Sequence, residues 1–242
     1  MNKEKERMRL RFGRILAAAM AASCAAWAAG NGRPEETVEC PVSANMRGHE
    51  NTEWSIYYGF HLTDANRGLP RVLLVGDSIC NGYQGAVQKR LDGKVNVSYW
   101  VSSYCVTSPN YLKFLSIYLD EAKYDVIHFN NGLHSLATPE AAWEKGIKAA
   151  FALIRQKQPG AKLVWCPSTP LKDAAKTKKA KALNDIAAKE AKRLGLAVDD
   201  LFSLLDPLDR EANWSDVFHH KPPLREKEAD QVAASVLSAL GK

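Results

Sequence analysis

Apolar residues follow two different spacings along the chain once Pro70 has been passed. One pattern consists of short apolar runs that are rich in β-branched residues, and such runs predict buried strands. They occupy residues 71–75, 95–101, 125–131, 162–168 and, more weakly, 196–201. In four other segments apolar residues recur every three or four positions, which places them on one face of a helix. These segments are 81–91, 143–154, 183–194 and 229–240.

Strands that alternate with helices of this length predict βαβ units, and therefore a parallel sheet with helices on both faces. We predict the α/β class for residues 70–242, as a flavodoxin-like three-layer α/β/α sandwich with a five-stranded parallel sheet. Residues 29–69 are polar and rich in turn residues, with aromatic side chains in "EWSIYYGF" (53–60). This segment is interpreted as an N-terminal wrap over the domain.

The first 28 residues have the pattern of an export signal. Basic residues up to Arg14 precede an apolar run, and Ala26, Trp27 and Ala28 form a small-x-small cleavage site. We interpret residues 1–28 as a signal peptide and expect an exported protein, either periplasmic, outer-membrane-associated or secreted. The residues before Cys24 also resemble a lipoprotein signal, so a lipid anchor at Cys24 is the alternative to a plain secretory signal.

Net charge and cysteine spacing narrow the range of partners. Six basic and two acidic residues among the first 28 contribute +4 of the formal net charge of +6, which leaves only +2 for the rest. We therefore expect no nucleic-acid partner. The spacing of Cys40, Cys80, Cys105 and Cys166 matches neither a zinc module nor a small disulfide framework. A bridge such as Cys80 to Cys105 remains open.

Polar side chains follow the predicted strands where parallel strands end, at the edge where α/β sheets bind ligands. Ser78 follows the first strand, and Ser102 and Ser103 follow the second. The remaining candidates are Asn130, Asn131 and His134 after the third strand, and Asp216 and His219 before the last helix.

These residue types match the needs of nucleophilic catalysis. A serine hydroxyl becomes reactive when an imidazole takes its proton, and a carboxylate holds that imidazole in place. Asp-x-x-His spacing allows a turn to bring Asp216 back to the ring of His219. The backbone N–H of Ser78, at a helix N-terminus, and an amide from the third strand's end are candidate donors to an oxyanion.

Each piece also has a structural interpretation. Gly-Asp-Ser is common in turns and helix caps, and Asn-Asn-Gly is common in turns. The order of the pieces along the chain favours catalysis over these alternatives. His128, in the middle of a strand, is interpreted as a core histidine, whereas His134 borders the crevice. His220 is expected to be dispensable, since neighbouring side chains on extended backbone point to opposite faces.

Other site chemistries lack their motifs. His134, His219 and His220 do not have the spacing of metal ligands, so we expect no metal. No phosphate-binding glycine motif follows any strand, so we expect no cofactor. Cys80 stands where a Gly-x-Ser-x-Gly elbow requires glycine.

From residue 71 to residue 240 the chain resembles the SGNH (GDSL-type) hydrolases. Their blocks are Gly-Asp-Ser after the first strand, Gly after the second, Asn after the third, and Asp-x-x-His near the C-terminus. The resemblance implies Ser78 as nucleophile, His219 as base, Asp216 as its partner, and Ser78 N–H as an oxyanion donor. It implies Asn131 as a second donor, with Asn130 as the fallback. The second-block glycine has no counterpart, so the backbone near Ser102 or Ser103 is considered instead.

The resulting expectation is an exported serine esterase that acts through an acyl-enzyme on carbohydrate O-acetyl esters, small or polymeric. An esterase for lipids or lysophospholipids is one alternative. A non-catalytic glycan-binding module on a degenerate hydrolase fold is another, because the glycine of the second block is missing.

Overall fold

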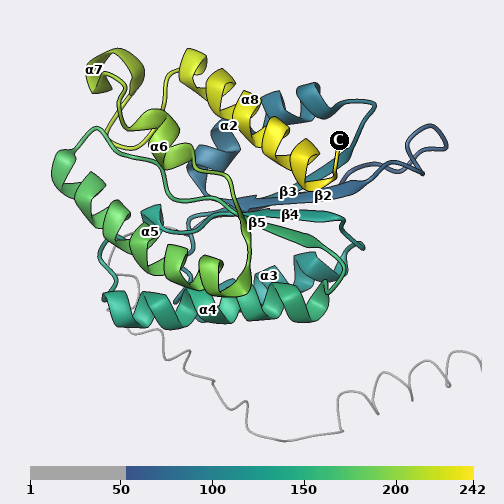
Figure 1. Ribbon diagram of the computed structural model, residues 1–242, viewed down its shortest axis with the longest axis horizontal. Helices are drawn as coiled ribbons and strands as arrows, with labels where there is room; N and C mark the ends of the chain where they lie inside the picture. Colours follow the sequence, from purple (N-terminus) through teal and green to yellow (C-terminus); the bar gives the residue numbers. More distant parts are fainter. Residues whose placement is uncertain (1–52) are drawn as a thin grey trace, which may run out of the picture. The chain divides into compact units, whose positions relative to one another are not determined.

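A computed structural model describes residues 53–242, and in this range the strands form one six-stranded sheet (Figure 1). The strands are β1 (Ser55–Tyr58), β2 (Arg71–Gly76), β3 (Asn96–Ser102), β4 (Val126–Phe129), β5 (Lys162–Trp165) and β6 (Ala197–Val198). Their order across the sheet is β1-β3-β2-β4-β5-β6. Strands β2 to β6 pair in parallel, which confirms the predicted five-stranded parallel sheet.

The sixth strand, β1, comes from the segment interpreted as a wrap. It pairs antiparallel with β3, with Ser55 opposite Ser102 and Tyr58 opposite Tyr99. The rings of Tyr58 and Tyr99 stack with centroids 5.4 Å apart, and Trp100 Nε1 donates to Ser55 Oγ over 2.8 Å. Residues 55–58 are therefore part of the sheet rather than a layer over it, because their backbone pairs with that of β3.

Helices cover both faces of the sheet, as predicted for a three-layer sandwich. Helices α2 (Ser78–Leu91) and α8 (Pro222–Ala239) lie on one face, and α3 (Tyr111–Asp120), α4 (Glu140–Lys157) and α5 (Ala174–Leu194) lie on the other (Figure 1). Three short elements sit in the connections: the 3-10 helix η2 (Leu133–Ser135), α6 (Leu201–Leu205) and α7 (Arg210–Asn213).

The central strand β2 shows why its sequence is continuously apolar. Val72 and Leu74 pack in the cluster under α2 and α8, whereas Leu73 and Val75 pack in the cluster under α3, α4 and α5. All four side chains are at most 1% exposed. A strand covered on both faces has no solvent side that would take polar residues.

Several element boundaries differ from the predicted ones for local reasons. Helix α2 begins at Ser78 instead of residue 81, because the Asp77 carboxylate caps it by accepting the Ile79 N–H over 2.9 Å. Strand β6 is only two residues long, and Asp200 already caps α6. Helix α3 was not predicted. Its buried residues Tyr111, Leu115 and Leu119 nevertheless recur at the helical spacing of four.

The structure also bears on the cysteines. Cys80, Cys105 and Cys166 are free and buried. Cys80 packs in the cluster under α2 and α8 and Cys105 in the cluster under α3 to α5, so the Cys80–Cys105 bridge does not form. Cys40, the signal peptide 1–28 with Cys24, and residues 29–52 lie outside the described residues. From residue 53 onwards, no helix has the length and apolarity needed to cross a membrane.

Candidate active site

Ser78 is the first residue of α2, immediately after the carboxyl end of β2. Asp77 is 3% exposed and acts as the N-cap of this helix, which is the structural role that Gly-Asp-Ser often has. A residue in the first turn of a helix has no intrahelical acceptor for its N–H. The Ser78 hydroxyl and its own N–H are thus presented together at the positive end of the helix.

His219 and Asp216 meet this serine from the loop before α8. His219 Nδ1 lies 2.8 Å from Asp216 Oδ2, and His219 Nε2 lies 3.0 Å from Ser78 Oγ. A carboxylate only accepts hydrogen bonds, so Nδ1 carries the proton and Nε2 is left as the acceptor that faces the serine hydroxyl. The three predicted residues form one continuous chain of hydrogen bonds.

The Asp216 carboxylate is held by a local turn. Its Oδ1 accepts the N–H groups of Phe218 and His219, each over 2.8 Å. Burial by itself raises the pKa of Asp216, but these two N–H groups and the imidazole outweigh it and lower the pKa to about 2. Asp216 is therefore an anion at every pH at which the protein is expected to work.

A cavity of about 350 Å³ opens onto Ser78 and His219. Its walls are mostly apolar and come from Trp54, Leu133, Leu136, Ala137 and Phe218. The other residues that line it are His134, Lys176 and Lys179. The sequence analysis placed His134 at this crevice but missed the apolar walls and both lysines, which carry no motif.

The chain shares its fold with solved structures. A protein from Slackia heliotrinireducens, provisionally described as an SGNH hydrolase, superposes with a TM-score of 0.57 at 16% identity, over 70% of this chain and 100% of that chain. An acetyl xylan esterase superposes with a TM-score of 0.57 at 16% identity, over 69% and 99%. A member of the lipolytic G-D-S-L family from Veillonella parvula gives 0.56 at 15% identity, over 69% and 96%.

This is the SGNH hydrolase fold. At these identities the likeness concerns the fold alone. No family model matches the sequence, and no curated protein matches it.

The amides expected as oxyanion donors of the SGNH fold have other partners. Asn130 donates from Nδ2 to the Cys166 carbonyl over 2.9 Å, which ties the ends of β4 and β5 together. Asn131 donates to the Tyr104 carbonyl over 3.0 Å and accepts the Val106 N–H. Neither asparagine lines the cavity at Ser78. Their side chains hold the strand ends and the loop after β3, and the structure does not place them on an oxyanion.

Ser102, the last residue of β3, and Ser103, which follows it, are also used structurally. Ser103 donates its N–H to the Trp54 carbonyl over 3.0 Å, and its Oγ accepts the Trp54 N–H over 2.9 Å. Ser102 pairs with Ser55 in the β1–β3 ladder. The Ser103 N–H is therefore not available to an oxyanion. Its bonds instead fix Trp54 in the cavity wall.

The neighbour of His219 has a structural role that the sequence analysis did not anticipate. His220 and Glu228 of α8 are both at most 1% exposed, and His220 Nδ1 lies 2.9 Å from Glu228 Oε1. The indole of Trp214 packs edge-on against the His220 ring. The two adjacent histidines have different partners: His219 faces Ser78, whereas His220 anchors the loop to α8. That His220 is dispensable for catalysis stays a prediction.

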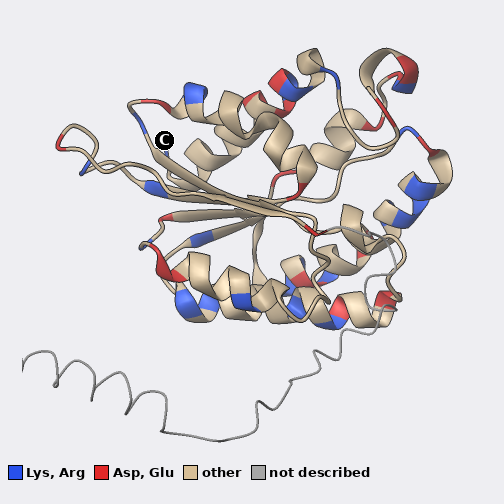
Figure 2. Cartoon of the chain, turned by 180° about the vertical axis from the view of Figure 1, so that it is seen from behind, with Lys and Arg blue, Asp and Glu red and all other residues tan. Residues whose placement is uncertain are grey.

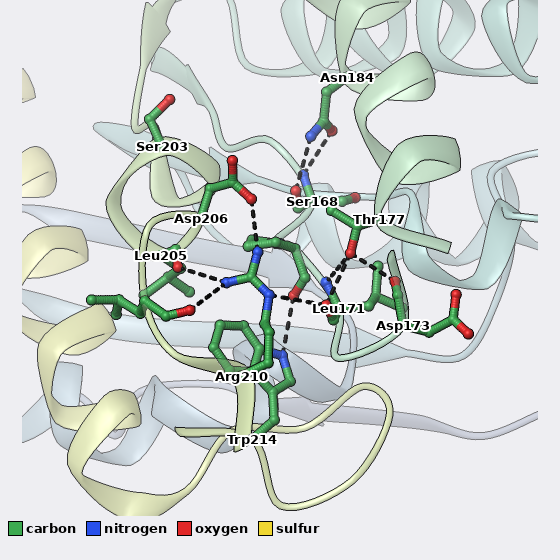
Figure 3. Close-up of polar contacts among 12 residues, drawn as sticks. Ser168, Leu171, Asp173, Thr177, Asn184, Ser203, Leu205, Asp206, Arg210 and Trp214 are labelled. Atoms are coloured by element: carbon green, nitrogen blue, oxygen red, sulfur yellow. Dashed lines mark hydrogen bonds and ion pairs between the residues drawn. The ribbon is translucent and has the colours of Figure 1, made fainter. Parts of the chain in front are cut away.

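A second set of contacts fixes the same loop from the side of β5 (Figure 3). The Arg210 guanidinium donates to the carbonyls of Leu171 and Leu205 and to the Asp206 carboxylate, and Trp214 Nε1 donates to the Pro170 carbonyl. Lys172 N–H donates to the Val217 carbonyl over 3.0 Å. The segment after β5 thereby holds the backbone between Asp216 and His219.

One group of potential metal ligands occurs within residues 53–242, and none of its members lines the cavity at Ser78. His128, Cys166 and Asp199 are buried close together. His128 Nε2 already lies 2.8 Å from Asp199 Oδ2, and Gln231 donates to Asp199 Oδ1. Burial and the Asp199 charge raise the pKa of the Cys166 thiol well above its usual range, which disfavours the thiolate that a metal requires. His128 is a core histidine, as the sequence predicted.

Proposed function

We propose that this protein is a serine esterase that forms an acyl-enzyme on Ser78. The observation that carries the proposal is the hydrogen-bonded chain from Ser78 through His219 to Asp216 beside a cavity. A turn or a helix cap accounts for Asp77. Neither of these structural roles requires an imidazole that contacts the hydroxyl of Ser78, or a carboxylate that contacts that imidazole.

The first half of the reaction follows from this geometry. Ser78 Oγ attacks the ester carbonyl carbon while its proton moves to His219 Nε2. The imidazolium that forms is stabilised by the Asp216 carboxylate, which remains ionised because its pKa is held to about 2. The negative oxygen of the tetrahedral intermediate is placed at the Ser78 N–H and the N-terminus of α2.

The second half returns the enzyme to its starting state. His219 gives its proton to the departing alkoxide, and the acyl group stays on Ser78 Oγ. Water then attacks the acyl-enzyme and gives its proton to His219. The carbonyl carbon–serine bond breaks, the acid is released, and Ser78 regains its proton.

For the substrate we propose O-acetyl esters of carbohydrates. The cavity is modest in volume and lined by aromatic residues, Trp54 and Phe218, on which a sugar ring can pack. Among the proteins of similar fold, one is an acetyl xylan esterase. The apolar walls also favour a second candidate, an esterase for longer acyl chains, and this candidate is compared directly in the experiment below.

We also propose that the protein is exported. The support is the basic, apolar and small-residue pattern of residues 1–28, with Cys24 as the candidate lipid anchor. These residues lie outside the described part of the chain. An ester of an extracellular polysaccharide is a substrate consistent with such a location.

The test compares the protein with a Ser78→Ala variant on 4-nitrophenyl esters of acetate, butyrate and octanoate. We expect hydrolysis with the highest kcat/KM on acetate, and a loss of about 10⁴-fold or more in the variant. A fluorophosphonate probe should label Ser78 alone, since within residues 53–242 the structure places no other serine hydroxyl against an imidazole.

Thermal unfolding is the control, because Ser78→Ala removes one oxygen from a half-buried position and should leave the fold intact. A higher kcat/KM on octanoate would favour the lipid esterase. Absence of hydrolysis on every ester would favour a non-catalytic glycan-binding module. Wild-type rates in Ser78→Ala would show that Ser78 is not the nucleophile and would overturn the proposed mechanism.

A further inference from the structure

The charged side chains at the rim of the cavity at Ser78 (Lys176 and Lys179) are both positive. Of the ten residues that line the cavity, all within the described range, only Lys176 and Lys179 are permanently charged, and both are positive. The remaining walls are apolar apart from Ser78, His134 and His219. A neutral ester would gain nothing from two ammonium groups at the mouth of its site.

The two lysines are not a random part of a basic surface. Residues 174–184, at the start of α5, contain four lysines and no acidic residue, and the ribbon of the first turns of this helix carries several blue Lys or Arg positions (Figure 2). Lysines 176 and 179 are three residues apart and share the face that lines the cavity, whereas Lys178 does not line it. Lys181 is already paired with Asp185 over 2.9 Å.

Of the two cavity lysines, only Lys176 has an acidic side chain of the described residues within ion-pair distance, and that contact is long. Lys176 Nζ lies 4.0 Å from the Asp173 carboxylate, which already accepts the Lys176 N–H as the cap of α5. In the part of the chain that the structure describes, Lys179 forms no ion pair. The lysine that follows β5, Lys172, is by contrast neutralised by Glu211 over 2.6 Å.

The lysines are also held in a fixed relation to the catalytic residues. Thr177 Oγ1 accepts the Leu171 N–H over 2.9 Å, and its single proton has the carbonyls of Leu171 and Asp173 within 2.9 Å as acceptors, which fastens the start of α5 to the segment after β5 (Figure 3). The same segment donates the Lys172 N–H to the Val217 carbonyl, next to His219. A rigid frame therefore joins the cationic rim to the imidazole.

We infer that the natural substrate is an acyl ester whose alcohol part carries an anionic group, such as a carboxylate, which Lys176 and Lys179 bind at the rim. The apolar walls take the acyl group and the body of the alcohol, and Ser78 meets the ester carbonyl between them. This inference rests on the proposed esterase function and specifies the substrate class of the same site.

The experiment compares two matched acetate esters, 4-acetoxybenzoate, which is an anion, and its methyl ester, which is neutral. The readout is the ratio of kcat/KM for the anionic ester to that for the neutral ester. Because each variant is compared with the wild type through this ratio, differences in intrinsic ester reactivity and in the amount of folded enzyme cancel.

We expect Lys176→Gln/Lys179→Gln to lower the ratio about fivefold at low ionic strength, the effect of losing two partly exposed charge contacts. Added salt of about 0.5 M should lower the wild-type ratio in the same direction through screening. Lys178→Gln/Lys189→Gln is the matched control: it removes the same charge from α5 at exposed positions outside the cavity and should keep the wild-type ratio.

Two results overturn the inference without touching the proposed function. In the first, the wild-type ratio persists in Lys176→Gln/Lys179→Gln. In the second, both double variants lower the ratio equally, which would indicate the general field of α5 rather than a binding position. If the wild type hydrolyses neither ester, the proposed esterase function itself fails, and the substrate class fails with it.

Discussion

Asp216 is the side chain whose protonation the structure constrains most directly. Hydrogen bonds from the Phe218 and His219 N–H groups and from the imidazole lower its pKa to about 2, below the usual 3.8, despite an opposing effect of burial. A carboxyl with a lowered pKa contributes its stabilisation above its ordinary pKa and loses it as the pH falls toward 2. Between neutrality and pH 4 the charge on Asp216 therefore does not change.

We predict that a single proton controls the acid side of the activity profile. Asp216 stays ionised above about pH 4 because its pKa is held to about 2, so it adds no second proton to the loss of activity. The logarithm of kcat/KM for an acetyl ester, measured from about pH 4 to pH 8, should fall with a limiting slope of one. Asp216→Asn should lower kcat/KM about a thousandfold by removing the acceptor that orients the ring. A limiting slope of two would mean that Asp216 titrates together with the ring.

The loop that carries Asp216 and His219 depends on its attachment to α8. His220 and Glu228 form a buried pair at this attachment, and burial raises the pKa of Glu228, with His220 lowering it again. Removing His220 leaves the carboxyl buried without its partner. A carboxyl with a raised pKa favours the folded state at low pH and loses that contribution as the pH rises through its folded pKa.

We predict that His220→Ala lowers stability by roughly 3 kcal/mol, the usual cost of breaking a buried pair. The loss should be larger at pH 8 than at pH 5, because the free-energy cost of keeping Glu228 protonated in the folded state grows as the pH rises above its ordinary pKa. Chemical denaturation at both pH values measures it. In His220→Ala/Glu228→Gln the difference between the two pH values should vanish. An unchanged denaturation midpoint in His220→Ala would show that the pair does not anchor the loop.

The molecule as a whole needs β1 for two purposes. This strand covers the edge of β3, and the residue before it, Trp54, forms part of the cavity wall. Ser103 N–H bonds the Trp54 carbonyl, and in an antiparallel pair hydrogen-bonded positions alternate, so Ile56 faces Val101 at the next such position. The Ile56 side chain itself is 44% exposed.

We predict that Ile56→Pro destabilises the protein and lowers esterase kcat/KM, although every residue of the Ser78–His219–Asp216 chain is present. Proline removes the backbone donor of the ladder and releases Trp54 from the wall. Ile56→Thr, which keeps the N–H and suits a strand, should have nearly wild-type stability and activity. Thermal unfolding and ester hydrolysis compare the two variants. Equal behaviour of the two would mean that β1 is not required.

The sequence alone was sufficient for the parallel sheet and for the three residues at its edge. Buried strands such as β2 and β4 have continuous apolar runs because both of their faces are covered, so composition predicts them without knowledge of their neighbours. The Asp-x-x-His turn closes through bonds within four residues, and Asp77 caps its helix two residues away. Interactions this local can be inferred from spacing.

The remaining features depend on segments that are far apart in the chain. Trp54 and Ser103 are 49 residues apart, and the contact makes a strand of a segment whose own pattern indicated a wrap. The Asn131 amide donates to the carbonyl of Tyr104, 27 residues away. His220 contacts Glu228 only because α8 folds back over the loop. Lys176 and Lys179 line the cavity because α5 starts beside it. Such partners cannot be predicted from spacing along the chain, because the packing of elements against one another brings them together.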